Sequence, residues 1–248
     1  MLKIQGILVP VSTPFDHRGD VYKAKLKSNV ERLNAISLAG YVAGGSLLTA
    51  EEKVLVWELV AASAKPGKLL GAAASVPSVR ETVALANRAA ELGYHFAFVG
   101  AAAEFGGETR TLYYRSVADA SRIPVVVDGD LAPEHPNILK VALTQESARL
   151  FGAFKDGATA ALVPVANAIP YSVQLVWEAY RQREDEAGAD WQERIRPLVA
   201  LVEAHGTPAL KCAMDLNSYY GGVPRLPLTP VAEWVKPAIA AALHDLKS

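Results

Sequence analysis

Residues 123–143 read IPVVVDGDLAPEHPNILKVAL and contain two short β-branched runs, each beside a polar group that could carry chemistry. The first run ends at Asp128-Gly129-Asp130, and the second carries Lys140 inside an otherwise apolar segment. Desolvation lowers the pKa of a lysine in a buried strand, because it disfavours the charged form, and the neutral amine is a nucleophile. This stretch therefore decides how the fold continues and whether the chain holds a reactive amine.

Strand and helix patterns alternate upstream of this stretch. Short apolar runs predict parallel strands that are buried on both faces, and segments with apolar residues at helical spacing lie between them. The strands are expected at 4–11, 41–43, 69–74, 95–99 and 123–127, and the helices at 21–37, 49–64, 78–92 and 109–121. Thr49 with Glu52, and Ser78 with Glu81, have the spacing of capping boxes at two helix starts. This alternation is typical of βαβ units in a parallel sheet.

The alternation becomes irregular after Asp130. The patterns predict strands at 138–143 and 159–165, a short helix at 146–154, and helices at 171–187, 190–205, 208–219 and 231–246. Seven strands are thus identified, and residues 144–149 are too few for the crossover of about a dozen residues that an eighth strand at 150–154 would need. The predicted fold is α/β, a TIM (β/α)8-type barrel with one βα unit irregular, reduced or missing, plus C-terminal helices. We expect one domain, with the barrel in residues 1–170 and its last helix and a helical region in 171–248.

Composition limits the class of protein. The 248 residues carry a net charge of −1 with Lys and Arg scattered along the chain, which argues against a nucleic-acid partner. The single cysteine excludes an internal disulfide and fits a reducing compartment. No segment reaches about 18 apolar residues without a charge, and the first apolar run is too short for a signal peptide. We expect a cytoplasmic protein with no membrane partner.

Several short motifs, in order and at similar spacing, resemble the dihydrodipicolinate synthase/N-acetylneuraminate lyase family of class I aldolases. They are VPVSTPFD at 9–16, LTAEE at 48–52, SVRET at 78–82, AAELG at 89–93, IPVVV at 123–127, VANAIP at 165–170, TPALK at 207–211 and VPRLPL at 223–228. The resemblance covers most of the chain. It implies a (β/α)8 barrel in which a lysine on the sixth strand forms a Schiff base with pyruvate or another small 2-oxo acid. It further implies a homo-oligomer, and we expect neither a cofactor nor a metal.

The positions that carry chemistry in that family are altered here. The family has a Gly-Thr-Thr-Gly-Glu loop where this chain has GGSL at 44–47, and a tyrosine where it has Asp128. Lys140 lies two residues before the position expected for the Schiff-base lysine. Because side chains alternate along a strand, a shift of two keeps the same face. We therefore predict Lys140 as the catalytic lysine and Asp128 as its proton carrier, with Lys211 as a structural lysine.

The predicted substrate site consists of Thr13, Gly44, Gly45, Ser46 and Asn167. Thr13 matches the threonine of the family's first strand. The Gly-Gly-Ser segment could form a nest of backbone amides for a carboxylate. Asn167 could instead satisfy backbone groups near the last strand.

Three alternatives stay open. If the segment around Lys140 is an amphipathic helix, Lys155 becomes the candidate amine. Glu104, Asp128 and Asp130 could hold Mg²⁺ in a metal-assisted lyase, since carboxylate oxygens suit that ion. The altered motifs also fit a degenerate or repurposed barrel that binds a 2-oxo acid or a protein partner without catalysis.

Overall fold

All strands among the described residues of the computed structural model, which are 2–100, 105–127 and 132–246, lie in one parallel sheet. The strands are β1 (Gly6–Pro10), β2 (Gly40–Ala43), β3 (Leu69–Ala73), β4 (Phe96–Val99), β5 (Val125–Val127), β6 (Leu143–Thr144) and β7 (Ala160–Leu162). Their order across the sheet is β5-β4-β3-β2-β1-β7-β6. Parallel neighbours need crossover connections, and helices supply them between β1 and β5, as the alternating patterns predict.

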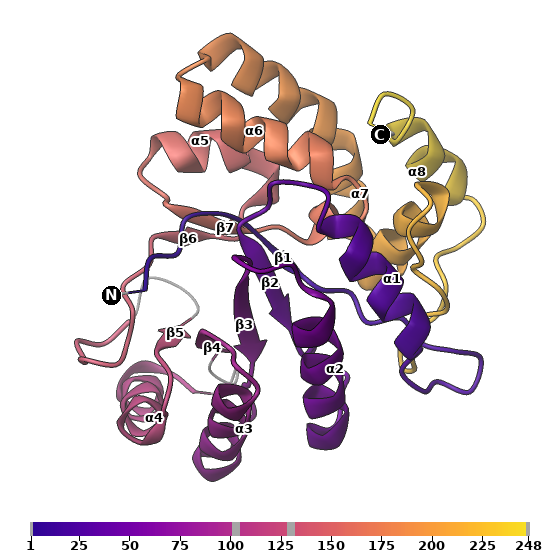
Figure 1. The fold of residues 1–248 in the computed structure, drawn as a ribbon. Helices are drawn as coiled ribbons and strands as arrows, with labels where there is room; N and C mark the ends of the chain where they lie inside the picture. The colour runs from indigo at the N-terminus through magenta and orange to yellow at the C-terminus, as the bar shows by residue number, and fades with distance from the viewer. Residues whose placement is uncertain (1, 101–104, 128–131, 247–248) are drawn as a thin grey trace.

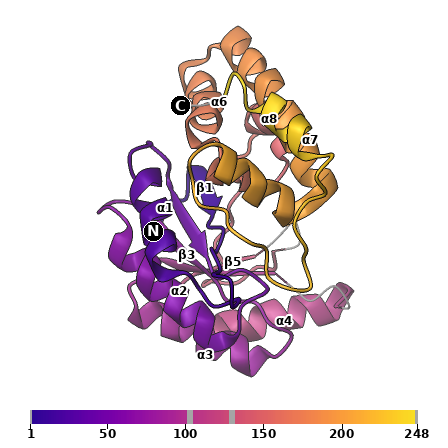
Figure 2. The same cartoon turned by 90° about the vertical axis from the view of Figure 1, so that its right-hand side faces the viewer.

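The helices cover the outside of the curved sheet. They are α1 (Lys23–Leu33), α2 (Ala50–Ser63), α3 (Val79–Glu91), α4 (Gly107–Ala120), α5 (Leu150–Lys155), α6 (Pro170–Gln182), α7 (Asp185–Leu216) and α8 (Lys236–Ala242). In both views α2, α3 and α4 lie together beside the strands, while α6, α7 and α8 lie on the other side of the molecule (Figures 1 and 2). Both helix starts are capped, but the predicted capping box is confirmed only at Thr49 with Glu52; at the other start the Ser78 side chain accepts from the Glu81 amide without the reciprocal bond of a capping box. No helix in the described ranges is long and apolar enough to cross a bilayer.

The ring of strands closes through the segment that follows β5. Ile138 forms an isolated parallel bridge with Val125, and a few residues later β6 pairs with β7. Residues 132–142 contain no helix. One segment therefore makes the contacts to β5 and to β7 that two strands would share in an eight-stranded barrel, so the prediction of a barrel with one reduced unit is confirmed. The strand predicted at 138–143 is shorter than expected, because only Leu143–Thr144 pair regularly.

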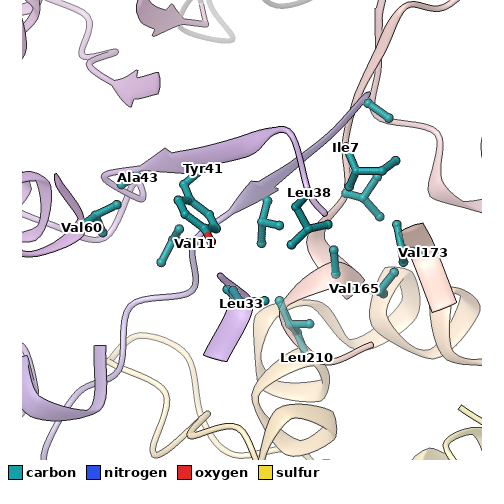
Figure 3. Close-up of a cluster of buried hydrophobic side chains, with 14 of the residues drawn as sticks. Ile7, Val11, Leu33, Leu38, Tyr41, Ala43, Val60, Val165, Val173 and Leu210 are labelled. Carbon is teal, nitrogen blue, oxygen red and sulfur yellow. The ribbon is translucent and has the colours of Figure 1, made fainter. Parts of the chain in front are cut away.

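Two clusters of buried side chains stabilise this arrangement. One cluster lies between the strands and the helices, where Ile7, Tyr41 and Leu210 are among the labelled side chains (Figure 3). The other contains residues of strands and their flanking segments and none from a helix, so it fills the interior of the ring. Successive residues of a strand point to opposite faces, and accordingly Ile7 belongs to the outer cluster and Leu8 to the inner one.

Candidate functional site

A cleft of about 270 Å³ lies beyond the carboxyl ends of β1, β2 and β7, which are neighbours in the sheet. The chain segments that leave these strands form one wall, and the second half of α7 with residues 225–228 forms the other. Residues of particular interest in these walls are Thr13, Gly45, Ser46, Lys211 and Arg225. Reactive groups of (β/α)8 barrels lie at this end of the strands, so the cleft is the candidate site.

Lys211 brings a buried amine to this cleft. Its side chain is 2% exposed, and Nζ donates to Thr13 O at 2.8 Å and to Gly221 O at 2.6 Å. Burial lowers its pKa to about 8, although the charge of Asp215 acts in the opposite direction. A neutral amine has two N–H groups and one lone pair. The two carbonyls therefore satisfy both donors of the neutral form and leave its lone pair free to react.

Thr13 contributes two different groups to the same place. Its backbone carbonyl accepts from Lys211, while its hydroxyl oxygen is buried and has no hydrogen-bond partner in the described part of the chain. A buried hydroxyl left unpaired costs about 1–3 kcal/mol. Thr13 also lines the cleft, so its unpaired hydroxyl lies close to the space that a ligand would fill.

The loop after β2 presents unpaired backbone donors to the cleft. It turns at Gly44, whose φ is +102°, and the carbonyls of Gly44 and Gly45 accept from Lys53 Nζ at 2.6 and 3.2 Å. The amides of Gly45, Ser46 and Leu47 donate to no other group among the described residues. Successive free amides attract an anion, so this loop has the donors that the predicted carboxylate nest requires.

Asn167 holds the strand ends together. Its Oδ1 accepts from the Ser12 amide at 3.0 Å, and its Nδ2 donates to Pro10 O at 2.8 Å and Pro164 O at 2.9 Å. The side chain is 1% exposed. Since backbone groups at the end of β1 and just beyond β1 and β7 occupy its polar atoms, the expectation that Asn167 contacts substrate is corrected: it positions the segments that carry the site.

Arg225 closes the rim of the cleft. Its guanidinium forms a two-pronged ion pair with Glu52 at 2.5 and 2.6 Å, and it also donates to Gly19 O and Leu47 O. Both partners of the ion pair are about 20% exposed. Arg225 thus connects the C-terminal segment to the loops that follow β1 and β2, and its N–H groups are taken up by the protein.

Lys140 lies away from this cleft. Its side chain is 62% exposed and forms an ion pair with Glu134. Its neighbours Leu139 and Val141 pack against the cluster inside the ring, so Lys140 faces outward. The expectation that a two-residue shift keeps the lysine on the inner face is therefore wrong. The segment pairs with β5 at Ile138 in a register that turns Leu139 and Val141 toward the inside of the ring. A change of one residue in this register would exchange the inner and outer faces of the segment.

The other predicted residues separate into two groups. Lys155 ends α5, is 49% exposed and pairs with Asp185 at 2.8 Å. Asp128, Asp130 and Glu104 lie outside the described residues, so the predicted proton carrier and the Mg²⁺ ligands stay predictions. Within the described ranges, no group of three or more His, Cys, Asp or Glu side chains is arranged to hold a metal ion.

Two functional candidates were not recognised from the sequence. The family resemblance implies a structural role for Lys211, and no motif in the sequence marks Lys53. Each lysine lies in a helix among buried residues: Lys53 is one turn before Trp57 in α2, and Lys211 follows Leu210 in α7. A lysine on the apolar face of an amphipathic helix is the signal for Lys211, whereas α2 has apolar residues on all sides and its sequence carries no such signal for Lys53.

Known proteins resemble this chain along nearly its whole length. Residues 3–127 match the family model described as the dihydrodipicolinate synthetase family. The L-threo-3-deoxy-hexylosonate aldolase of Aspergillus niger is 26% identical over 97% of this chain and 94% of its own length. Two solved structures share the fold. Dihydrodipicolinate synthase from Acinetobacter baumannii, complexed with pyruvate, is 21% identical with a TM-score of 0.90 over 98% of this chain and 99% of that one. N-acetylneuraminate lyase from Mycoplasma synoviae is 20% identical with a TM-score of 0.87 over 99% of both chains.

Proposed function

Because the chain belongs to the dihydrodipicolinate synthetase family of Schiff-base lyases and aldolases, we propose that Lys211 forms the Schiff base here, with a small 2-oxo acid bound in the cleft. The observation that carries this proposal is the buried Lys211 amine, whose two hydrogen bonds leave a lone pair free in its neutral form. The exposed, ion-paired Lys140 offers no comparable environment. The competing assignment keeps Lys140 as the nucleophile, with Asp128 as its proton carrier.

The proposed reaction begins with attack of the neutral Lys211 amine on C2 of the 2-oxo acid. A C–N bond forms, and the carbonyl oxygen leaves as water with one proton from the amine and one from solvent. The resulting iminium withdraws electrons from C3 while the bond between C3 and C4 breaks or forms. The free amides of Gly45 and Ser46 would hold the carboxylate, and the Thr13 hydroxyl would donate to the carbonyl oxygen.

The proposal also includes where the protein acts and how it assembles. We keep the homo-oligomer that the resemblance implies and the cytoplasmic location that the single cysteine suggests. Size-exclusion chromatography coupled to light scattering would test the first. A repurposed barrel that binds a 2-oxo acid without reacting with it is the second candidate function, because Lys140 does not lie inside the ring.

Trapping with pyruvate and borohydride tests the proposal. Borohydride reduces the imine to a secondary amine, so the intact mass should increase by that of pyruvic acid less one oxygen atom. Peptide mapping is expected to locate the adduct on Lys211. Lys140→Ala is the matched control: its exposed ion pair contributes at most about 1 kcal/mol, so stability and adduct yield should stay unchanged. An adduct on Lys140 would establish the competing assignment, and no adduct with pyruvate or other 2-oxo acids would leave only the binding function.

Replacing Thr13 by valine should separate function from stability. Valine keeps the shape of threonine but removes a hydroxyl that is buried without a partner, so the free energy of unfolding should be unchanged or rise by up to about 1 kcal/mol. The rate of adduct formation should fall about tenfold, since one donor to the reacting oxygen is lost. Urea denaturation and trapping kinetics measure the two effects. A destabilised Thr13→Val variant with a normal trapping rate would show that the hydroxyl is structural.

A further inference from the structure

Lys53 is a second buried amine, and its surroundings differ from those of Lys211 in one respect. It lies on α2, is 4% exposed, and its Nζ donates to Gly44 O at 2.6 Å, Gly45 O at 3.2 Å and Ala73 O at 3.0 Å. Burial lowers its pKa to about 8. A protonated amine has three N–H groups, and here each has an acceptor. Lys53 is therefore satisfied as a cation that holds backbone carbonyls, whereas Lys211, within the described part of the chain, has two carbonyl acceptors and the face of the Phe15 ring at 5.3 Å.

The three carbonyls lie at the ends of neighbouring strands. Gly44 and Gly45 follow β2, and Ala73 ends β3. One turn further along α2, Trp57 Nε1 donates to Ala43 O at 2.9 Å. The helix thus fixes the direction of successive peptide groups where the chain leaves β2.

The direction of these carbonyls determines the direction of the next amides. In a trans peptide the C=O of one residue and the N–H of the following residue point in opposite directions. The carbonyls of Gly44 and Gly45 point toward Lys53, so the N–H groups of Gly45 and Ser46 point away from α2. Both residues line the cleft, and their amides have no partner within the described ranges.

We propose that Lys53 is a positioning residue for substrate: it orients two peptide groups of the loop so that the amides of Gly45 and Ser46 bind the carboxylate. The identification of the ligand as a 2-oxo acid rests on the proposed function. The orientation of the amides is inferred from the hydrogen bonds of Lys53 and, at Gly45 O, also from that of the Leu48 amide at 3.3 Å. The residue acts through the backbone and does not touch the reacting atoms.

Lys53→Met tests this role because methionine keeps the length of the side chain and removes its N–H groups. The pyruvate concentration that gives half-maximal trapping should rise about tenfold or more, since charged hydrogen bonds to the carboxylate are weakened. The trapping rate at saturating pyruvate should change less than twofold. Trapping of hydroxyacetone, which has a carbonyl but no carboxylate, should be unaffected. Lys53→Arg should partly restore the affinity for pyruvate.

Trp57→Phe is the matched control on the same helix. It removes a hydrogen bond to Ala43 O and leaves the carbonyls of Gly44 and Gly45 with their partner. Its half-maximal pyruvate concentration should stay within about twofold of that of the wild type. If Lys53→Met is folded by circular dichroism and traps pyruvate at wild-type concentrations, or loses affinity for hydroxyacetone equally, the positioning role is overturned.

A second measurement does not depend on lysine chemistry. Titrating the ¹⁵N-labelled full chain with acetate should shift the amide signals of Gly45 and Ser46 in the wild type and in Trp57→Phe, but not in Lys53→Met. If pyruvate gives no adduct but these shifts occur, the proposed function fails and the positioning role stands. If acetate leaves both amide signals of the wild type unmoved, the positioning role is overturned, whether or not Lys53→Met folds.

Discussion

Lys211→Met is expected to lower the rate of pyruvate trapping at least about 100-fold, because the variant lacks the nucleophile that the Schiff base requires. Methionine fills a similar volume, so the walls of the cleft should be retained. The variant leaves two carbonyls, Thr13 O and Gly221 O, without their donor, which costs about 1–3 kcal/mol for each buried group. Circular dichroism and urea denaturation must therefore show a folded chain before the rate is compared. Normal trapping by folded Lys211→Met would contradict the assignment.

The pH dependence of the wild type provides an independent check that needs no variant. Burial lowers the pKa of Lys211 to about 8, and only the neutral amine reacts. About one tenth of such lysines are neutral at pH 7, so the trapping rate should rise nearly tenfold per pH unit below pH 8 and become constant above it. Cyanoborohydride allows this measurement across the range. An exposed lysine of ordinary pKa, near 10.4, would instead give a rate that still rises steeply at about pH 9.5.

Saturating pyruvate is needed for this profile because Lys53 loses its proton in the same range. Burial lowers the pKa of Lys53 to about 8 as well, and its neutral form has one N–H group fewer for the three carbonyls. Above this pH the loop should bind the carboxylate less firmly, so the half-maximal pyruvate concentration should rise. The trapping rate at saturating pyruvate then reports the protonation of Lys211. The half-maximal pyruvate concentration reports how firmly the loop binds the carboxylate.

Gly44→Ala should strongly destabilise the loop that follows β2. Gly44 has a φ of +102°, which L-residues rarely adopt, and a Cβ there would lie 2.7 Å from Trp57 Nε1 and 3.1 Å from Ala73 O. Backbone strain and steric overlap each cost about 1–3 kcal/mol, so the free energy of unfolding should fall by about 2–6 kcal/mol. The melting temperature should fall by roughly 4–24 °C for a chain of this size.

Gly45→Ala is the matched control for this substitution. A Cβ at Gly45 meets nothing within 4 Å, and its φ lies outside the left-handed range. Its stability should stay within about 0.5 kcal/mol of the wild type. Thermal and urea denaturation of the two variants side by side measure the difference. If Gly44→Ala and Gly45→Ala lose the same stability, the positive φ and close contacts of Gly44 are not what the loop requires.

The way in which the ring of strands closes explains why Lys140 does not lie where the family's lysine is expected. The chain joins β5 to the segment at Ile138 without a helix in residues 132–142, and this segment then pairs with β7 through β6. The part of the barrel that would carry the family's lysine is thereby reduced, and Lys140 is left on the outer face. The buried Lys211 makes its contact beside the end of β1, at Thr13 O.

Local patterns along the chain predict the alternation of strands and helices, the capped helix starts at Thr49 and Ser78, the number of strands and the resemblance to the family. These features depend on periodicity, caps and turn residues, which act within a few positions along the chain. The same patterns also place Thr13 and the Gly-Gly-Ser loop at the carboxyl ends of strands, because parallel strands present those ends at one side.

Which lysine is buried and which is exposed depends on how distant segments pack together. The face of Lys140 depends on the register of its segment against β5, and a single position exchanges inside for outside. The environment of Lys211 depends on Thr13, 198 residues away in the chain, and on the packing of α7 against the end of β1. Desolvation is a property of the assembled surroundings of an amine, so no local pattern of residues could report it.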